Sequence, residues 1–453
     1  MTLDSPLFLF LFLPITLAVV FFIPRRFKFA VLLLLSLLYY AWFEPVLIFA
    51  ALMITLWGFW LAIEIGKSGD NEIKAKRWLL VGVISNIGGL LLVKILGINF
   101  TGLSFLVFVI LAYLFDVFNQ LIQPERSIWK FLFHAFFFPK VVSGPIMRYQ
   151  QTSEQLENFK IDLKEGVLRL IIGLAKKMLL ANPLGIITDS IFNISAGTIT
   201  PAIAWIGAIC YALQIYYDFS GYSDMAIGLG RFFGFNIPEN FNYPYLATSI
   251  TNFWRRWHIT LSNWFRDYVF LPLEISRRRS PYKWFEYVNI LIVFGLVGIW
   301  HGLDWTFIIW GLLHGFCISL ETLFKNRYKK YPGTLKRVYT LLILLIGWVF
   351  FRSPTVQYAL AYLKSMVGIY NPGQLQVLLP MYFSPYNFGL MAFGIFFAVP
   401  MGSWIGKFFE KKQVPIPSWM IKPIEAIGLL ILFVLSLLAV ADSTYQAFIY
   451  FQF

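Results

Sequence analysis

Apolar runs of close to 20 residues recur along the whole length of this 453-residue chain and leave it few possible folds. A helix of about 20 apolar residues matches the hydrocarbon thickness of a bilayer, where backbone groups must find hydrogen-bond partners within their own segment. The runs therefore predict an all-α polytopic membrane protein with roughly ten to twelve transmembrane helices. They lie at about 6–24, 27–43, 45–65, 78–96, 99–122, 178–194, 202–218, 284–300, 303–324, 336–352, 385–404 and 421–441.

Charge and cysteine content narrow the class of protein. Only 13% of the residues are charged, whereas a soluble domain carries about a quarter. The net charge of +14 comes from Lys and Arg in the gaps between apolar runs, where cytoplasmic loops and anionic headgroups favour them. We therefore expect the lipid bilayer, and no nucleic acid, as a partner. Cys210 and Cys317 form no C-x-x-C pair and predict neither a disulfide framework nor a metal site.

The distribution of basic residues predicts an orientation. Lys and Arg follow the first, third and fifth runs, whereas the gaps after the second and fourth runs contain neither. The positive-inside rule then places the N-terminus outside and the basic loops in the cytoplasm. Periodicity leaves open whether residues 130–147 cross the membrane, re-enter it or lie flat.

The middle of the chain, from Tyr217 to Trp310, is rich in polar, aromatic and glycine residues. Asp218 and Asp224 follow an apolar run and are predicted to lie at the end of its helix. Carboxylates face lipid only at high cost, so they should face a cavity, a partner or the interface. The alternative is a pair of solvated acids at a cytoplasmic helix end.

Alternating aromatic and cationic residues at 253–258 predict a helix that lies in the headgroup region. On such a helix His258 would share the aromatic face of Trp254, four residues earlier. His258 is then either a structural histidine or part of an acyl-donor site.

His301 is the strongest candidate for chemistry because it stands at the junction of two long apolar runs. An ionisable group there is costly in lipid, and an imidazole can accept a hydroxyl proton during attack on a carbonyl. Gly298 and Gly302 would let a ligand or a neighbouring helix approach closely. The alternative is a histidine that only packs helices or lies in a loop. His314, half-way along the next run, is expected to make a structural hydrogen bond to a neighbouring helix.

Nine motifs, in this order, resemble those of the membrane-bound O-acyltransferase superfamily and of its bacterial polysaccharide O-acetyltransferase branch. They are SPLFLF (5–10), GLSF (102–105), FPKVVSGPI (138–146), DFSGYSD (218–224), ENFNYP (239–244), FWRRWH (253–258), WFRDY (264–268), WHG (300–302) and FIYFQF (448–453). The resemblance implies one membrane-embedded acyltransferase domain over residues 1–453, with its core at about 100–325. It also implies a central funnel between tilted helices, with additional interfacial and re-entrant helices.

The resemblance further implies catalytic roles for His301 and His258. They would move an acetyl group from a cytoplasmic thioester towards hydroxyls of a cell-envelope polysaccharide of the alginate or peptidoglycan type. Donor-binding residues would be Lys140, Arg255, Arg256, Trp254, Trp257, Asn242, Asp218, Trp300 and Trp305. Acetyl-CoA or an acyl-carrier thioester would be the donor substrate, with no bound cofactor or metal.

Expected partners are a periplasmic or extracellular acetyltransferase and an acyl-carrier protein, at the bacterial cytoplasmic membrane. Three alternatives remain open at the level of sequence. They are D-alanyl transfer to teichoic acid from a carrier protein, a transporter or flippase without acyl chemistry, and a scaffold for a secreted enzyme complex.

Overall fold

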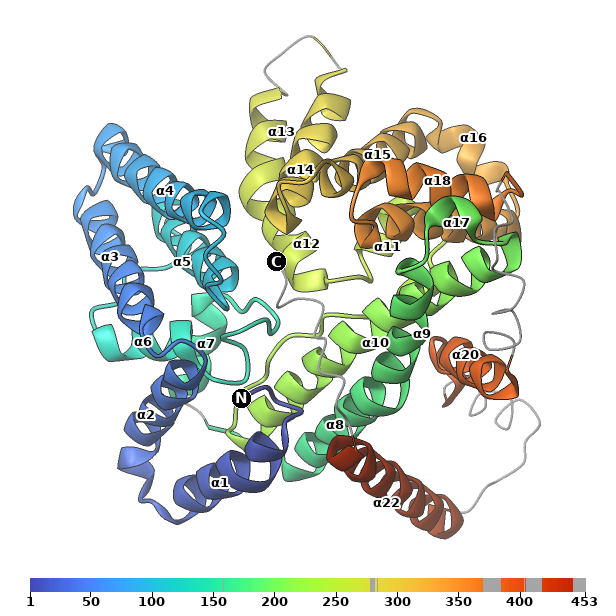
Figure 1. The fold of residues 1–453 in the computed structure, drawn as a ribbon. Coiled ribbons are helices and arrows are strands. Elements are labelled where there is room, and N and C mark those ends of the chain that lie inside the picture. The colour runs from blue at the N-terminus through green and yellow to red at the C-terminus, as the bar shows by residue number, and fades with distance from the viewer. Residues whose placement is uncertain are drawn as a thin grey trace. The chain divides into compact units, whose positions relative to one another are not determined.

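The computed structural model describes residues 1–157, 159–277, 282, 284–369, 384–402, 404 and 418–442 (Figure 1). Every regular element within these ranges is a helix. Eight of these helices are long and apolar enough to cross a membrane, and four shorter apolar helices accompany them. The predicted all-α polytopic fold is confirmed. The terminal motif at 448–453 lies outside the described residues, and the central funnel stays a prediction.

The chain divides into two compact units. Unit 1 comprises Met1–Leu170 and Tyr222–Glu239, and unit 2 comprises Ile171–Gly221 and Asn240–Phe453. The helices that begin in unit 1 are the π-helix η1 (Phe8–Phe12), α1 (Leu13–Phe22), α2 (Arg25–Phe43), α3 (Leu47–Lys67), α4 (Glu72–Ile95), α5 (Leu103–Phe118), α6 (Ile128–Phe136), α7 (Tyr149–Glu157) and α8 (Leu163–Ala175).

The helices that begin in unit 2 are η2 (Lys176–Ala181), α9 (Asn182–Phe192), η3 (Ala196–Thr198), α10 (Pro201–Phe232), η4 (Pro244–Leu246), α11 (Ile250–Trp254), α12 (Ile259–Phe265), η5 (Arg266–Phe270), α13 (Leu271–Arg277), α14 (Phe285–His301), α15 (Trp305–Leu323), α16 (Lys325–Lys330), α17 (Gly333–Arg352), α18 (Val356–Met366), α20 (Pro385–Phe397) and α22 (Ser418–Asp442). The units divide within α8, within α10 and after Glu239.

Unit 1 is built around α5, which packs against α3 and α4. Gly58 and Gly82 bring these two helices close to the Ile110 and Leu114 side chains of α5. The nine-residue helix α6 covers only about 13 Å and is too short to cross a bilayer. A run of turns follows it, so the segment 130–147 does not form a simple span.

Helix α10 corrects the prediction of a span that ends near residue 218. The helix has 32 residues and continues through Asp218 and Asp224. Both carboxylates are buried, so the alternative of solvated acids is wrong as well. The helix continues because each acid has a cation from the preceding helical segment as its partner, and hydropathy alone does not reveal such a partner.

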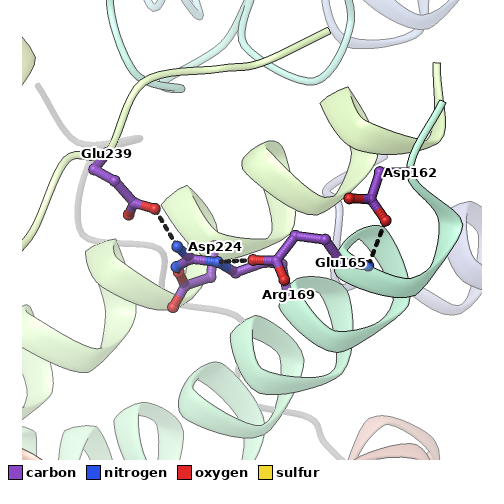
Figure 2. Close-up of polar contacts among 5 residues, drawn as sticks. All are labelled: Asp162, Glu165, Arg169, Asp224 and Glu239. Carbon is purple, nitrogen blue, oxygen red and sulfur yellow. Dashed lines mark hydrogen bonds and ion pairs between the residues drawn. The ribbon is translucent and has the colours of Figure 1, made fainter. Parts of the chain in front are cut away.

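Figure 2 shows the partner of Asp224, the guanidinium group of Arg169 in α8. Nη1 of Arg169 lies 2.6 Å from Asp224, and Nε lies 3.1 Å from Glu165 on the preceding turn of α8. Nη2 pairs with Glu239, in the segment that follows α10. One arginine in unit 1 thus joins three carboxylates from three parts of the sequence, an arrangement that suits the planar, five-donor guanidinium group.

The partner of Asp218 is Lys177, whose Nζ lies 2.5 Å from Oδ1 of Asp218 in unit 2. Lys177 lies in the π-helical turn η2, which continues α8 into α9. The predicted run at 178–194 is therefore only the second part of a helix that extends from 163 to 192. A lysine inside that helix is compatible with the membrane because Asp218 neutralises its charge.

Candidate functional site

Helices α14 and α15 form a tightly packed pair that carries two of the four histidines. A Cβ atom added to Gly298 would lie 2.6 Å from the backbone oxygen of Phe307, and one added to Gly311 would meet the backbone oxygen of Phe294. The close approach of a neighbouring helix that Gly298 predicts is confirmed. At Gly302 the neighbour is the Phe307 ring.

His301 is the last residue of α14, and its side chain is only 4% exposed. Its ring centroid lies 4.4 Å from that of Trp300, 5.0 Å from that of Trp310 and 4.9 Å from that of Phe351. The position at the junction of two apolar helices is confirmed. The imidazole is enclosed by protein aromatic groups and is thereby sheltered from lipid.

His258 does not lie on a helix, contrary to the prediction. Helix α11 ends at Trp254, and α12 begins at Ile259. His258 itself has φ +44° and ψ +54°, a left-handed conformation that is uncommon for residues with a Cβ atom. The i, i+4 argument that paired it with Trp254 is therefore wrong, because the chain turns between these residues.

The turn places the His258 ring in the same aromatic cluster as His301. Its centroid lies 4.6 Å from that of Phe219 and 6.5 Å from that of Trp300, which in turn contacts His301. His258 is 1% exposed, and burial lowers its pKa from 6.5 to about 3. The ring is therefore neutral at physiological pH, which is the state that can accept a proton.

Asn240 is a residue of this site that the sequence analysis missed. Its Oδ1 lies 3.3 Å from Nδ1 of His258 and accepts hydrogen bonds from N and Oγ1 of Thr260 at 3.1 and 2.9 Å. Its backbone oxygen accepts a hydrogen bond from Ile259 at 2.9 Å. Asn240 and His258 are 18 residues apart, and the motif ENFNYP gives no sign of which asparagine faces the histidine.

Asn242, the predicted site residue, has a different role in the same turn. Its backbone nitrogen donates to the backbone oxygen of Arg256 at 2.9 Å, and Nη1 of Arg256 donates to the backbone oxygen of Asn242 at 3.1 Å. These bonds hold the segment after α10 beside the turn that carries His258. Arg255 is exposed, and the predicted contacts of both arginines with phosphate stay predictions.

The two tryptophans of this motif are core residues, so the prediction of a helix in the headgroup region is wrong. Trp254 donates from Nε1 to Nδ1 of His314 at 3.0 Å. The predicted structural hydrogen bond of His314 to a neighbouring helix is thereby confirmed. Trp257 is buried, with its ring centroid 5.1 Å from that of Trp348.

The buried carboxylate of Glu321, a residue of α15, holds the start of helix α11 in place. The Glu321 side chain accepts hydrogen bonds from the backbone nitrogens of Ile250 and Thr251 at 2.6 and 3.1 Å. These are two of the free N–H groups at the start of a helix. The turn at His258 therefore follows a helix that is held at both ends, by Glu321 and by the bond from Trp254 to His314.

The remaining predicted site residues lie in different environments. The Trp300 ring is a neighbour of both the His258 ring and the His301 ring, whereas Trp305 is 69% exposed at the start of α15. Asp218 is bound to Lys177. The roles predicted for Asp218 and Trp305 in donor binding stay predictions.

Lys140 belongs to unit 1 and follows α6. Its Nζ donates to the backbone oxygen of His134 at 2.5 Å, and its side chain lines a small hollow together with Ala135 and Gly144. Burial lowers the pKa of Lys140 from 10.5 to about 7. Its predicted contact with a donor phosphate stays a prediction.

Comparison with known proteins assigns the chain to a family. The model of the membrane-bound O-acyltransferase family matches residues 92–357, more than half of the chain, and this range contains both His258 and His301. The chain belongs to this family. A membrane-bound O-acyltransferase is an enzyme, so the transporter and scaffold hypotheses are not supported.

Relatives of this membrane-bound O-acyltransferase act on different acceptors. A probable alginate O-acetylase of Pseudomonas putida is 32% identical, and the match covers 100% of both chains. A peptidoglycan O-acetyltransferase of Helicobacter pylori is also 32% identical, over 81% of this chain and 80% of that protein. A teichoic acid D-alanyltransferase of Bacillus subtilis is 30% identical, over 55% of this chain and 65% of that protein.

Proposed function

We propose that this membrane-bound O-acyltransferase moves an acetyl group from a cytoplasmic thioester towards hydroxyls of a cell-envelope polysaccharide, with His301 as general base. The observation that carries the proposal is the burial of the His301 imidazole at the junction of α14 and α15, within the region matched by the family. An ionisable side chain in that position is costly to maintain and marks a functional site.

The chemistry assigned to His301 is general base catalysis. As the acceptor oxygen attacks the thioester carbonyl, its proton passes to the imidazole. The new C–O bond forms, the C–S bond breaks, and the imidazolium returns the proton to the departing thiolate. A positioned base of this kind accelerates transfer by roughly 10²–10⁴-fold. We assign His258, whose ring shares the neighbour Trp300 with His301, to the donor side of the same site.

The proposal includes a donor, partners and a location. The donor is acetyl-CoA or an acyl-carrier thioester, and an acyl-carrier protein and an extracytoplasmic acetyltransferase are the proposed partners. The enzyme is placed in the bacterial cytoplasmic membrane with its N-terminus outside, as the distribution of Lys and Arg favours.

An acetyl group and a polysaccharide are preferred because of the extent of similarity. The two O-acetyl-transferring relatives match at least 81% of this chain, whereas the D-alanyltransferase matches 55%. D-alanyl transfer to teichoic acid is the second candidate. Mass spectrometry of envelope glycans from a deletion strain separates the two, because an O-acetyl ester and an O-D-alanyl ester differ in mass.

The test of His301 is complementation of the deletion strain with His301→Gln. We expect envelope ester content to remain at the level of the deletion strain, although the variant accumulates in the membrane. His314→Gln is the matched control, because its ring centroid lies 5.2 Å from that of Trp310, against 5.0 Å for His301. Full ester content with His301→Gln would refute the base role, and equal losses per folded molecule in both variants would indicate that His301 only packs helices.

A further inference from the structure

We propose that Asn240 is a positioning residue that fixes the tautomer of His258, so that Nδ1 carries the hydrogen and Nε2 presents the lone pair. The inference deepens the proposed function and rests on it, because it assigns the atom through which His258 would act. The contacts that the buried side-chain oxygen of Asn240 makes with the turn between α11 and α12 support this inference.

The first step is the identity of the side-chain atom that faces the histidine. The Asn240 side-chain atom that is hydrogen-bonded to the backbone nitrogen of Thr260, at 3.1 Å, must be the oxygen Oδ1, because a peptide N–H can only donate. The Thr260 hydroxyl lies 2.9 Å from the same atom. The peptide N–H of Thr260, which can only donate, therefore fixes the orientation of the Asn240 amide. This removes the usual ambiguity between the oxygen and the nitrogen of that amide.

The second step is the state of the imidazole. Nδ1 of His258 lies 3.3 Å from this oxygen. An unprotonated Nδ1 would point its lone pair at the lone pairs of the oxygen, so Nδ1 must carry the hydrogen. Because the ring is neutral, Nε2 then has the lone pair. A neutral imidazole in this state accepts a hydrogen bond or a proton through Nε2 only.

The third step is that the surroundings hold the ring in place. Asn240 is completely buried, and its backbone oxygen also binds Ile259. The Phe219 ring meets the His258 ring nearly at a right angle, at 87°. These contacts hold the turn at His258 and its ring in place. The ring therefore has little freedom to flip and swap the positions of Nδ1 and Nε2.

The direct test is nitrogen-15 NMR of the full-length protein in lipid nanodiscs, with all four histidines labelled. Loss of signals in His258→Gln identifies those of His258. We expect wild-type His258 to have a protonated Nδ1 and an unprotonated Nε2. The opposite tautomer would overturn the proposal without any measurement of activity.

Variants of Asn240 test the consequence for transfer. Asn240→Leu removes the acceptor, and we expect a mixture of tautomers and a loss in transfer rate of a few-fold, because only the fraction of His258 with an unprotonated Nε2 stays competent. Asn240→Asp keeps an acceptor oxygen, so Nδ1 should stay protonated and part of the rate should return. The adjacent carboxylate should raise the pKa of His258 and shift the acid limb of the pH–rate profile upward.

Thr260→Val is the matched control, because it removes the hydroxyl that binds the same Asn240 oxygen and leaves the oxygen itself. Its His258 tautomer should be that of the wild type. An Asn240→Leu protein in which Nδ1 remains fully protonated would overturn the proposal. Full activity of His258→Gln would instead overturn the proposed function of His258, and the NMR signals distinguish that failure from failure of the tautomer assignment.

Discussion

Nε1 of Trp254 lies 3.0 Å from Nδ1 of His314, and this single hydrogen bond joins the end of α11 to the middle of α15. The bond is fully buried, with His314 inaccessible to solvent. It connects the turn that carries His258 to the helix that packs against α14 and His301. The stability of this part of unit 2 should therefore depend on a donor at position 254.

Trp254→Phe should destabilise the protein, because it leaves a buried acceptor on His314 without its donor. An unsatisfied buried group costs about 1–3 kcal/mol, and the smaller ring adds a packing loss. The measurement is the thermal unfolding midpoint in detergent. Trp305→Phe changes a tryptophan that is 69% exposed, so its effect should stay within about 0.5 kcal/mol. Similar shifts for both variants would contradict the prediction.

Lys177 and Asp218 should show strong energetic coupling, because both side chains are buried within the membrane region. Lys177→Met leaves a buried carboxylate without its cation and should cost about 3–5 kcal/mol. The double variant with Asp218→Leu should recover much of that loss, and a double-mutant cycle of unfolding midpoints measures the recovery. Additive effects would argue against the ion pair.

The control for this cycle is the pair Lys67–Glu64, in which the lysine side chain is 63% exposed. Lys67→Ala should cost less than about 1 kcal/mol, the usual range for exposed ion pairs. A large effect there would indicate that the assay responds to the loss of any surface charge and does not report the buried pair.

Gly298→Ala should force α14 and α15 apart, because the new Cβ would lie 2.6 Å from a backbone oxygen. Overpacking of this kind costs about 1–3 kcal/mol. Since His301 is one turn away, transfer per folded molecule should also fall. Gly295→Ala is the matched control on the same helix, where the nearest atom would be the Leu312 side chain at 3.8 Å. That variant should retain its activity and gain up to about 1 kcal/mol from helix propensity.

Lys140 should give the free energy of unfolding a pH dependence in the alkaline range. Its pKa is about 7 in the folded protein and near 10.5 in the unfolded chain. Between these values the unfolded chain binds more protons, so stability rises with pH by up to about 1.4 kcal/mol per unit. Below pH 7 both states are charged, and the folded state bears the full cost of a buried ammonium group.

The measurement compares wild type and Lys140→Met by thermal unfolding from pH 7 to 10. The rise in midpoint with pH should be smaller in Lys140→Met, because the variant lacks the titrating amine. Lys67→Met, which removes an exposed amine, should keep the wild-type slope. If Lys140→Met and wild type have equal slopes, the buried amine does not titrate in this range.

The long apolar helices and the position of His301 were predictable because both depend on local sequence. A run of apolar residues defines a span, and a histidine between two such runs must lie at the junction of two helices. Asp218 and Asp224 were misplaced because their partners, Lys177 and Arg169, lie more than forty residues earlier. Hydropathy treats such acids as the end of a helix, whereas an ion pair lets the helix continue.

The environment of His258 was not predictable for a related reason. The pattern of residues 253–258 predicts a helix, whereas the backbone turns at His258, whose left-handed conformation is not indicated by the sequence. Asn240 then reaches the ring through tertiary packing across 18 residues. The motif that contains both asparagines was recognised, but only the structure distinguishes Asn240, which binds through its side chain, from Asn242, which binds Arg256 through its backbone.

The length of α10 links this enzyme to the lipids around it. Its 32 residues span about 48 Å, whereas the hydrocarbon layer of a typical bilayer is about 30 Å thick. The helix must tilt or extend into the headgroup region, and its favoured tilt angle changes with the acyl-chain length of the lipids. Phe219, which contacts the His258 ring, is part of this helix. We therefore expect the transfer rate of this protein to depend on the thickness of the membrane as well as on its substrates.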